Sequence, residues 1–148
     1  MNDEERNNLP HSELTGGILN CSFEVMKELG PGFQEKIYKN ALLITLKQKG
    51  LRVETEQSFE VAYRGIVIGR YSADLVVEKT VIVELKCCES LIREHQAQLF
   101  NYLKVSKLPV GLLINFRRRK LECKRLHGQE GYEDDAEIVL ERIRSLAN

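Results

Sequence analysis

The sequence predicts a single α/β domain whose core elements follow the order helix, strand, strand, strand, helix, strand. Apolar residues recur at helical spacing before Gly50, the period shortens to two residues from Leu51, and helical spacing returns over residues 90–104 between two apolar strands. The 148 residues suffice for one well-formed core, and a composition of 43% hydrophobic and 30% charged residues is typical of a globular protein.

Two helices open the predicted domain, after a lead-in over residues 1–13 that we expect to be flexible. Apolar residues at helical spacing indicate the first helix, up to the breaker Gly30-Pro31-Gly32. They are Ile18, Cys21, Val25 and Leu29. The second helix runs from about Phe33 to Lys49 and ends at Gly50. Its predicted buried stripe consists of Phe33, Ile37, Ala41 and Ile44, whereas Glu35 and Tyr38 lie one turn apart on a neighbouring face.

Alternation of apolar and polar residues then predicts three strands. The first runs from Val53 to Tyr63 and ends at a hairpin turn formed by Arg64-Gly65. The second covers residues 66–77, the next turn is Glu78-Lys79, and the third strand covers residues 80–86.

A crossover helix and a fourth strand complete the core. Ser90 is the predicted N-cap of a helix that ends at about Lys104, and Pro109 precedes the apolar strand 110–116. Two strands joined by a helix form a right-handed parallel pair, so the central sheet is mixed. We expect residues 14–126 to form this domain, with a short edge strand at 121–126. Residues 127–148 should add a polar link and a last helix, capped by Asp134 or Asp135, packed on the same domain.

Charge and cysteine content exclude several classes of protein. The net charge is zero, so no global field attracts nucleic acid or an anionic membrane, and any such binding needs a local patch. No two of the four cysteines have CxxC spacing, and a disulfide between the adjacent Cys87 and Cys88 is geometrically unfavourable. We therefore expect reduced thiols. The acidic start has no apolar signal segment, and no run approaches the roughly 20 apolar residues of a membrane span. We therefore expect a soluble cytoplasmic protein with no membrane partner.

Charged residues interrupt two strands where the apolar pattern calls for burial. On the third strand Glu84 and Lys86 share one face, while Val83 and Leu85 occupy the other. A carboxylate in such surroundings is costly unless it is paired, hydrogen-bonded or bound to a metal. A structural Glu84–Lys86 pair, either buried or on a solvated sheet edge, is the alternative to a functional site.

Further polar side chains could converge with these two. They are Glu35 on the second helix, Asp74 on the second strand and Gln98 on the crossover helix. Carboxylates with an amide oxygen form a hard ligand set that suits Mg²⁺ or Mn²⁺ rather than zinc. We expect such an ion between Asp74 and Glu84, with the Leu85 backbone carbonyl and waters as further ligands. The ion would activate a water for attack on phosphorus, and a neighbouring Lys would assist.

These residues resemble a known pattern. Asp74, followed ten residues on by Glu84-Leu85-Lys86 within the predicted order of elements, resembles the PD-(D/E)xK nuclease superfamily, although Ala73 replaces the Pro of its name. Residues 32–38 read as GxxExxY, and with the segments 95–103 and 111–116 they are similar to the GxxExxY protein family of that superfamily. The resemblance spans about Leu14 to Leu126.

The resemblance implies a restriction-endonuclease-like fold and a Mg²⁺- or Mn²⁺-dependent phosphodiesterase acting on DNA or RNA. It implies that Asp74 and Glu84 are metal ligands and that Lys86 is the catalytic lysine. Glu35 would be an auxiliary acid at the metal, and Gln98 an amide that lines the site. The family is named by its motif and not by a reaction, so fold membership does not establish catalysis.

A basic run lies just after the fourth strand. Arg117, Arg118, Arg119 and Lys120 form either a solvated turn or a grip on phosphates. His95, one turn before Gln98, either lines the site or is structural, and Tyr38 is expected to be a half-buried aromatic with a satisfied hydroxyl. The rival functions are a catalytically silent module that binds nucleic acid or a protein, and a small-molecule hydrolase. A homodimer is possible.

Overall fold

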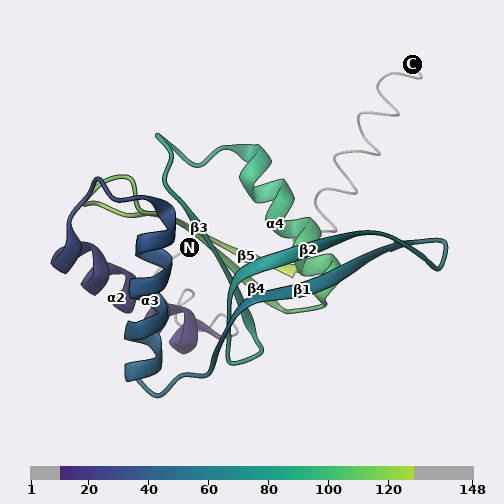
Figure 1. The fold of residues 1–148 in the computed structure, drawn as a ribbon, viewed down its shortest axis with the longest axis horizontal. Helices are drawn as coiled ribbons and strands as arrows, with labels where there is room; N and C mark the ends of the chain where they lie inside the picture. Colours follow the sequence, from purple (N-terminus) through teal and green to yellow (C-terminus); the bar gives the residue numbers. More distant parts are fainter. Residues whose placement is uncertain (1–10, 129–148) are drawn as a thin grey trace.

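A five-stranded mixed sheet forms the centre of residues 11–128, the part of the chain that this computed structural model describes (Figure 1). Its strands lie in sequence order: β1 (Val53–Tyr63), β2 (Ile66–Val77), β3 (Val81–Lys86), β4 (Val110–Asn115) and β5 (Glu122–His127). β3 and β4 run parallel, joined by the crossover helix α4 (Arg93–Ser106), and the other neighbours are antiparallel. The predicted α/β class, mixed sheet and order of core elements are confirmed.

Helices cover both faces of the sheet. The helices α2 (Ser12–Leu29) and α3 (Glu35–Gln48) lie on one side, and α4 lies on the other (Figure 1). Val83 and Leu85 belong to the core under α2 and α3, whereas Ile82 belongs to the core under α4. Because side chains alternate along a strand, Glu84 and Lys86 share the α4 face with Ile82.

The face that α3 buries differs from the prediction. Tyr38, Leu42 and Leu46 point into the core, while Ile37 and Ile44 are exposed, Ile44 to 57%. Phe33 lies before the helix and is also exposed. The helix has apolar residues on several faces, so spacing alone does not select the buried one.

Tyr38 supplies the contacts that set this rotation. Its hydroxyl donates to the Gly30 carbonyl at 2.7 Å and accepts the Phe33 N–H at 3.1 Å, and its ring stacks on Phe116. It is fully buried rather than half-buried, and its hydroxyl is satisfied as predicted. The Gly-Pro-Gly turn is thereby tied to the start of α3.

Other predicted boundaries need small corrections. α2 begins at Ser12 and buries Ile18, Cys21 and Val25, but its last residue, Leu29, is 37% exposed. β3 begins at Val81, β4 ends at Asn115 and β5 extends to His127. The lead-in residues 1–10 and the C-terminal link and helix from residue 129 lie outside the described residues. Within residues 11–128, no helix is long and apolar enough to cross a membrane.

α4 begins later than predicted, and Ser90 does not cap it. Ile92 is the N-cap residue, and its N–H donates to the ring of His95 at 3.1 Å. The preceding loop is bonded to two strands of the sheet. Glu122 of β5 accepts the Leu91 N–H at 2.6 Å. The side chain of Asn115 on β4 accepts the Cys88 N–H and donates to the Cys88 carbonyl. Ile92 itself has an extended backbone, with φ −114° and ψ 169°, so residues 90–92 lie outside the helix.

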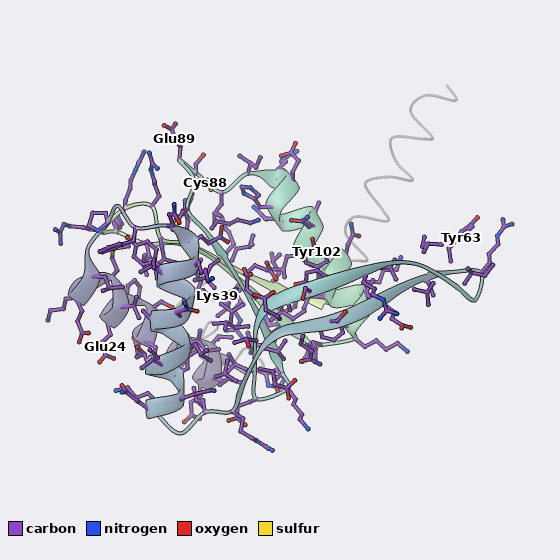
Figure 2. All side chains as sticks on the ribbon, viewed as in Figure 1. Glu24, Lys39, Tyr63, Cys88, Glu89 and Tyr102 are labelled. Atoms are coloured by element: carbon purple, nitrogen blue, oxygen red, sulfur yellow. The ribbon has the colours of Figure 1, made fainter. Side chains whose placement is uncertain are left out.

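β1 and β2 extend beyond the other strands as a two-stranded arm (Figure 1). Its turn is Arg64-Gly65 as predicted, with both residues at positive φ, 51° and 78°. Tyr63 lies close to the tip, far from the helices (Figure 2), and the Arg64 guanidinium lies over its ring.

Candidate functional site

The candidate site lies where β2 and β3 separate. Their pairing runs from Val77 and Val81 to Leu75 and Val83, and the next residues, Asp74 and Glu84, lie at the fork. At this fork, carboxyl side chains bond backbone N–H groups at the point where the β2–β3 ladder ends. The two residues nominated from the sequence are thus brought together by the sheet itself.

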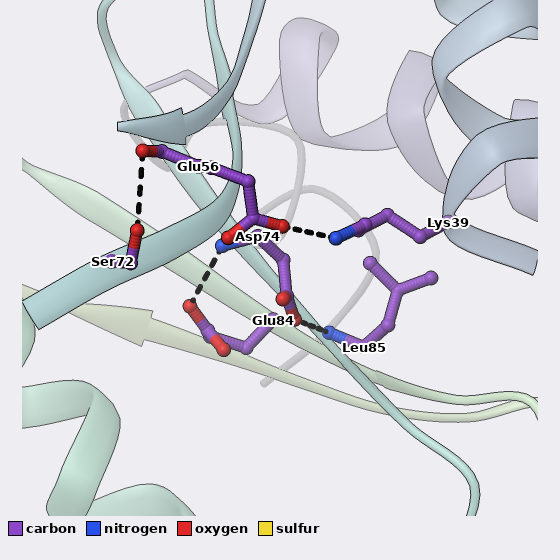
Figure 3. A network of polar contacts seen from close by, with 6 residues as sticks. All are labelled: Lys39, Glu56, Ser72, Asp74, Glu84 and Leu85. Atoms are coloured by element: carbon purple, nitrogen blue, oxygen red, sulfur yellow. Dashed lines mark hydrogen bonds and ion pairs between the residues drawn. The ribbon is translucent and has the colours of Figure 1, made fainter. Parts of the chain in front are cut away.

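Two reciprocal hydrogen bonds close the fork (Figure 3). The Asp74 N–H donates to Oε1 of Glu84 at 3.3 Å, and the Leu85 N–H donates to Oδ2 of Asp74 at 3.0 Å. Each carboxyl group is therefore anchored through one oxygen to the backbone of the other strand.

β2 is irregular at Asp74. Tyr71 and Ala73 belong to the core under α4, whereas Leu75 belongs to the core under α2 and α3, although residues two apart normally share a face. On the neighbouring β1, Glu56 has a φ of 53° and the register omits the Glu56–Asp74 pair. Such strained positions cluster at functional sites. Asp74 lies where β2 changes face, and its side chain meets β3 through the Leu85 N–H.

Glu84 is a buried carboxyl group with only 8% of its surface exposed. Burial, and next the charge of Asp74, raise its pKa to about 8, against hydrogen bonds from Tyr71 and the Asp74 backbone that lower it. The Tyr71 hydroxyl donates to Oε1 of Glu84. Burial and the nearby Glu84 charge raise the pKa of Tyr71, which keeps this donor protonated.

α3 brings Glu35 and Lys39 toward the same place. The pKa of the exposed Glu35 is raised by partial burial and by the charge of Asp74, against the charges of Lys86 and Lys39. Lys39 forms an ion pair with Glu56, which raises the pKa of the lysine, and its side chain reaches from α3 toward Asp74 (Figure 3). Asp74 and Lys86 are thus both within charge range of Glu35.

An open groove of about 580 Å³ runs from Glu84 along the β1–β2 arm. Its polar lining includes Lys86 on β3, Arg70 on β2 and Gln98 on α4. Gln98 is exposed and bonds the hydroxyl of Tyr102, another lining residue, whose side chain lies at the α4 face of the sheet (Figure 2). Three of the predicted positions, Glu84, Lys86 and Gln98, therefore line the groove, and Asp74 adjoins it through its hydrogen bond to Glu84.

The donor set of the fork suits a hard divalent cation. Like charge and burial both raise the pKa of Glu84, and a cation between the two carboxylates would relieve both costs. In residues 11–128, however, no three His, Cys, Asp or Glu side chains are grouped as a metal cluster. A bound ion would complete its shell with backbone oxygen and water, as Mg²⁺ commonly does.

A family model decides the relationship of this chain. The model described as the PD-(D/E)XK nuclease superfamily matches residues 12–126, most of the chain. The chain belongs to the PD-(D/E)XK nuclease superfamily. Asp74 and the Glu84-Leu85-Lys86 segment lie within the matched residues.

Solved structures similar to this nuclease-superfamily chain share little sequence with it. The structure titled SSO0001 has a TM-score of 0.49 and 22% identity, covering 62% of this chain and 48% of that chain, so this chain spans about half of SSO0001. An alkaline exonuclease from Laribacter hongkongensis, LHK-Exo, has a TM-score of 0.46 and 11% identity over 84% of each chain. LHK-Exo in complex with dAMP has a TM-score of 0.43 and 13% identity, covering 86% of this chain and 93% of that one. No curated protein matches this chain.

The basic run lies at the same end of the superfamily sheet as Lys86. Arg117, Arg118, Arg119 and Lys120 are all exposed. The parallel register pairs Lys86 with Asn115, and Phe116 N–H donates to the Lys86 carbonyl at 2.8 Å. The run therefore begins beside the end of the strand that carries Glu84.

Other singled-out residues of this nuclease-superfamily chain have structural contacts. His95 accepts the Ile92 N–H at the start of α4. Cys87 and Cys88 are half-buried free thiols: Cys87 packs against the core under α2 and α3, and the Cys88 thiol donates to the Ser90 carbonyl at 3.3 Å.

Sequence reasoning missed three residues of the nuclease-superfamily site: Tyr71, Lys39 and Glu56. Tyr71 reads as one more aromatic residue of an alternating strand, and Glu56 as a solvated strand residue. Lys39 follows Glu35 by one helical turn, which was the available signal for its position. Tyr71 meets Glu84 on the neighbouring strand and Glu56 meets Lys39 on α3, and no local pattern indicates such contacts.

Proposed function

We propose that this chain is a divalent-metal-dependent nuclease that hydrolyses phosphodiester bonds in nucleic acid. Asp74, Glu84 and the Leu85 carbonyl would hold Mg²⁺ or Mn²⁺. The observation that carries the proposal is the carboxyl pair at the strand fork, with Lys86 beside it on the groove. Membership of the PD-(D/E)XK superfamily supports it.

The Leu85 carbonyl is a reasonable ligand because of its direction. The Leu85 N–H points toward β2, where it meets Asp74, whereas the Lys86 carbonyl points toward β4 and accepts the Phe116 N–H. In a strand, the N–H and C=O of one residue point to the same side. The Leu85 carbonyl thus points into the fork, where the β2–β3 ladder has ended.

The residues around the fork would share the chemistry. The bound ion would supply an activated water and offset negative charge on the phosphate. Lys86 would stabilise that charge or deprotonate the attacking water, and Glu35 would act as an auxiliary acid on the α3 side. Gln98 would line the substrate path in the groove.

The basic turn suits the phosphates of a nucleic acid. We propose that Arg117, Arg118, Arg119 and Lys120 contact the backbone, since they are exposed and begin beside the end of β3. The motif of Gly32, Glu35 and Tyr38 supports assigning the chain to the GxxExxY proteins within the superfamily.

The decisive variant is Lys86→Met, which keeps the apolar stem and removes the ammonium. Cleavage of single- and double-stranded DNA and RNA in Mn²⁺ should fall about a hundredfold or more, with the melting temperature and Mn²⁺ affinity retained. Lys47→Met, at an exposed position of α3, is the matched control and should cleave like the wild type. An equally active Lys86→Met would overturn the catalytic assignment.

A companion measurement tests the ion. Mn²⁺ should raise the melting temperature of the wild type and not that of Asp74→Ala/Glu84→Ala, because an ion bound to the native state alone stabilises it. If the wild type binds Mn²⁺ but is inert on every substrate, the chain is a catalytically silent module. Cleavage of nucleotides but not of polymers would indicate a small-molecule hydrolase.

A further inference from the structure

Two donors converge on the same oxygen of Glu84. The Tyr71 hydroxyl and the Asp74 N–H both donate to Oε1. A carboxylate oxygen that already accepts two hydrogen bonds has little lone-pair capacity left for a cation. Because both bonds go to Oε1, Oε2 is the oxygen of Glu84 that they leave available to a cation.

The hydroxyl of Tyr71 is held in place by its ring. Tyr71 is 8% exposed, and its ring stacks on Tyr102 of α4, with an interplanar angle of 11°, and on Phe59 of β1, with an angle of 20°. Elements on both sides of Tyr71 therefore fix where its hydroxyl points. The Tyr102 hydroxyl faces Gln98 in the groove and makes no bond to Glu84 among those the structure gives.

We propose that Tyr71 is a positioning residue that makes Glu84 a one-oxygen ligand and thereby favours Mg²⁺ over Ca²⁺ at the fork. This inference rests on the proposed function, which places the ion between Asp74 and Glu84. Mg²⁺ requires about six ligands in near-octahedral geometry, whereas Ca²⁺ takes six to eight and accepts both oxygens of one carboxylate. Blocking Oε1 therefore penalises Ca²⁺ more than Mg²⁺.

The test is the ratio of Mg²⁺ to Ca²⁺ affinity, measured by titration calorimetry on the full chain without substrate. Tyr71→Phe keeps the stacked ring and removes the hydroxyl. Its Mg²⁺ affinity should fall about tenfold, as is usual when a partner of a metal ligand is lost, while Ca²⁺ binding is retained or gained. The ratio should then fall about tenfold or more.

Tyr102→Phe is the matched control, because it keeps the stack and lacks a bond to Glu84. Its ratio should stay within about twofold of the wild type. If the ratio of Mg²⁺ to Ca²⁺ affinity in Tyr71→Phe equals that of the wild type, this inference is overturned, whereas the proposed nuclease function is unaffected. A wild type that binds neither ion would overturn both.

A second measurement holds even if Tyr71→Phe fails to fold. The infrared carboxylate stretches of the wild type, with Glu84→Gln subtracted to assign Glu84, distinguish coordination through one oxygen from coordination through two. With Mg²⁺ bound, Glu84 should show the one-oxygen pattern. The two-oxygen pattern with Mg²⁺ would overturn the inference.

Discussion

At the scale of single residues, the site depends on a buried carboxyl group. Glu84 is surrounded by apolar strand neighbours and the Asp74 charge, and Tyr71 binds one of its oxygens. Ionising a carboxyl group in this environment costs electrostatic free energy, and a bound cation would offset that cost. Its protonation should therefore be visible in the stability of the metal-free protein.

The pKa of Glu84 predicts the direction of that pH dependence. A folded pKa of about 8 exceeds the ordinary 4.5, so the folded state retains a proton that the unfolded state releases. The stabilisation is complete below about pH 4.5 and is lost as pH rises to about 8, by up to ~1.4 kcal/mol per pH unit. Urea unfolding of metal-free protein from pH 5 to 8 should show a steeper decline for the wild type than for Glu84→Gln.

Saturating Mn²⁺ gives the control for this prediction. Because the ion binds the ionised carboxylate, it should flatten the wild-type decline and leave Glu84→Gln nearly unchanged. Parallel profiles for the two metal-free proteins would contradict the raised pKa.

At the scale of elements, the site depends on how closely α4 approaches the sheet. Gly111 of β4 lies directly under Leu99 of α4, and a Cβ atom at Gly111 would meet the Leu99 side chain at 2.8 Å. Gln98 and Tyr102 lie on the same helix and line the groove, so the distance between α4 and the sheet determines the position of one wall of the groove.

Gly111→Ala should therefore destabilise the protein by about 1–3 kcal/mol, because the added methyl overpacks a filled core. Gly69→Ala on β2 is the matched strand control, since nothing lies within 4 Å of its Cβ position. Denaturant unfolding of both variants makes the comparison. Equal stabilities would show that α4 moves away from the sheet at little cost.

At the scale of the whole molecule, the charge is balanced and yet locally uneven. The net charge is zero, while four consecutive exposed basic residues occupy positions 117–120. Arg119 also reaches the Gly30 turn that precedes α3, so the basic turn lies beside the segment leading to Glu35. Binding of a polyanion should depend on this end of the sheet rather than on the overall field.

Neutralising Arg118 and Arg119 with Gln should weaken nucleic-acid binding across sequences. On duplex DNA, the slope of log affinity against log salt should become shallower by roughly 0.9 for each phosphate that is no longer neutralised. Lys27→Gln/Lys47→Gln removes the same charge from exposed positions of α2 and α3 and should keep the wild-type slope. Binding isotherms at several salt concentrations distinguish the pairs. An unchanged slope in the arginine variant would identify the run as a solvated turn.

The sequence by itself determined the elements, their order and the charged residues of the candidate site. Periodicity located every core strand and helix to within a few residues, and Asp74, Glu84 and Lys86 were singled out as charged residues on apolar strands and by their resemblance to the superfamily pattern. These properties are local, because alternation and helical spacing directly reflect backbone geometry.

Only the tertiary structure decided how α3 is rotated, where α4 begins and what holds Glu84. Tyr38 fixes the rotation of α3 through bonds to Gly30 and Phe33, and Glu122 of β5 binds the loop that precedes α4 through the Leu91 N–H. Tyr71 meets Glu84 across two strands. Each outcome depends on contacts between segments that are separated along the chain or brought together by a turn, and local propensity carries no information about such contacts.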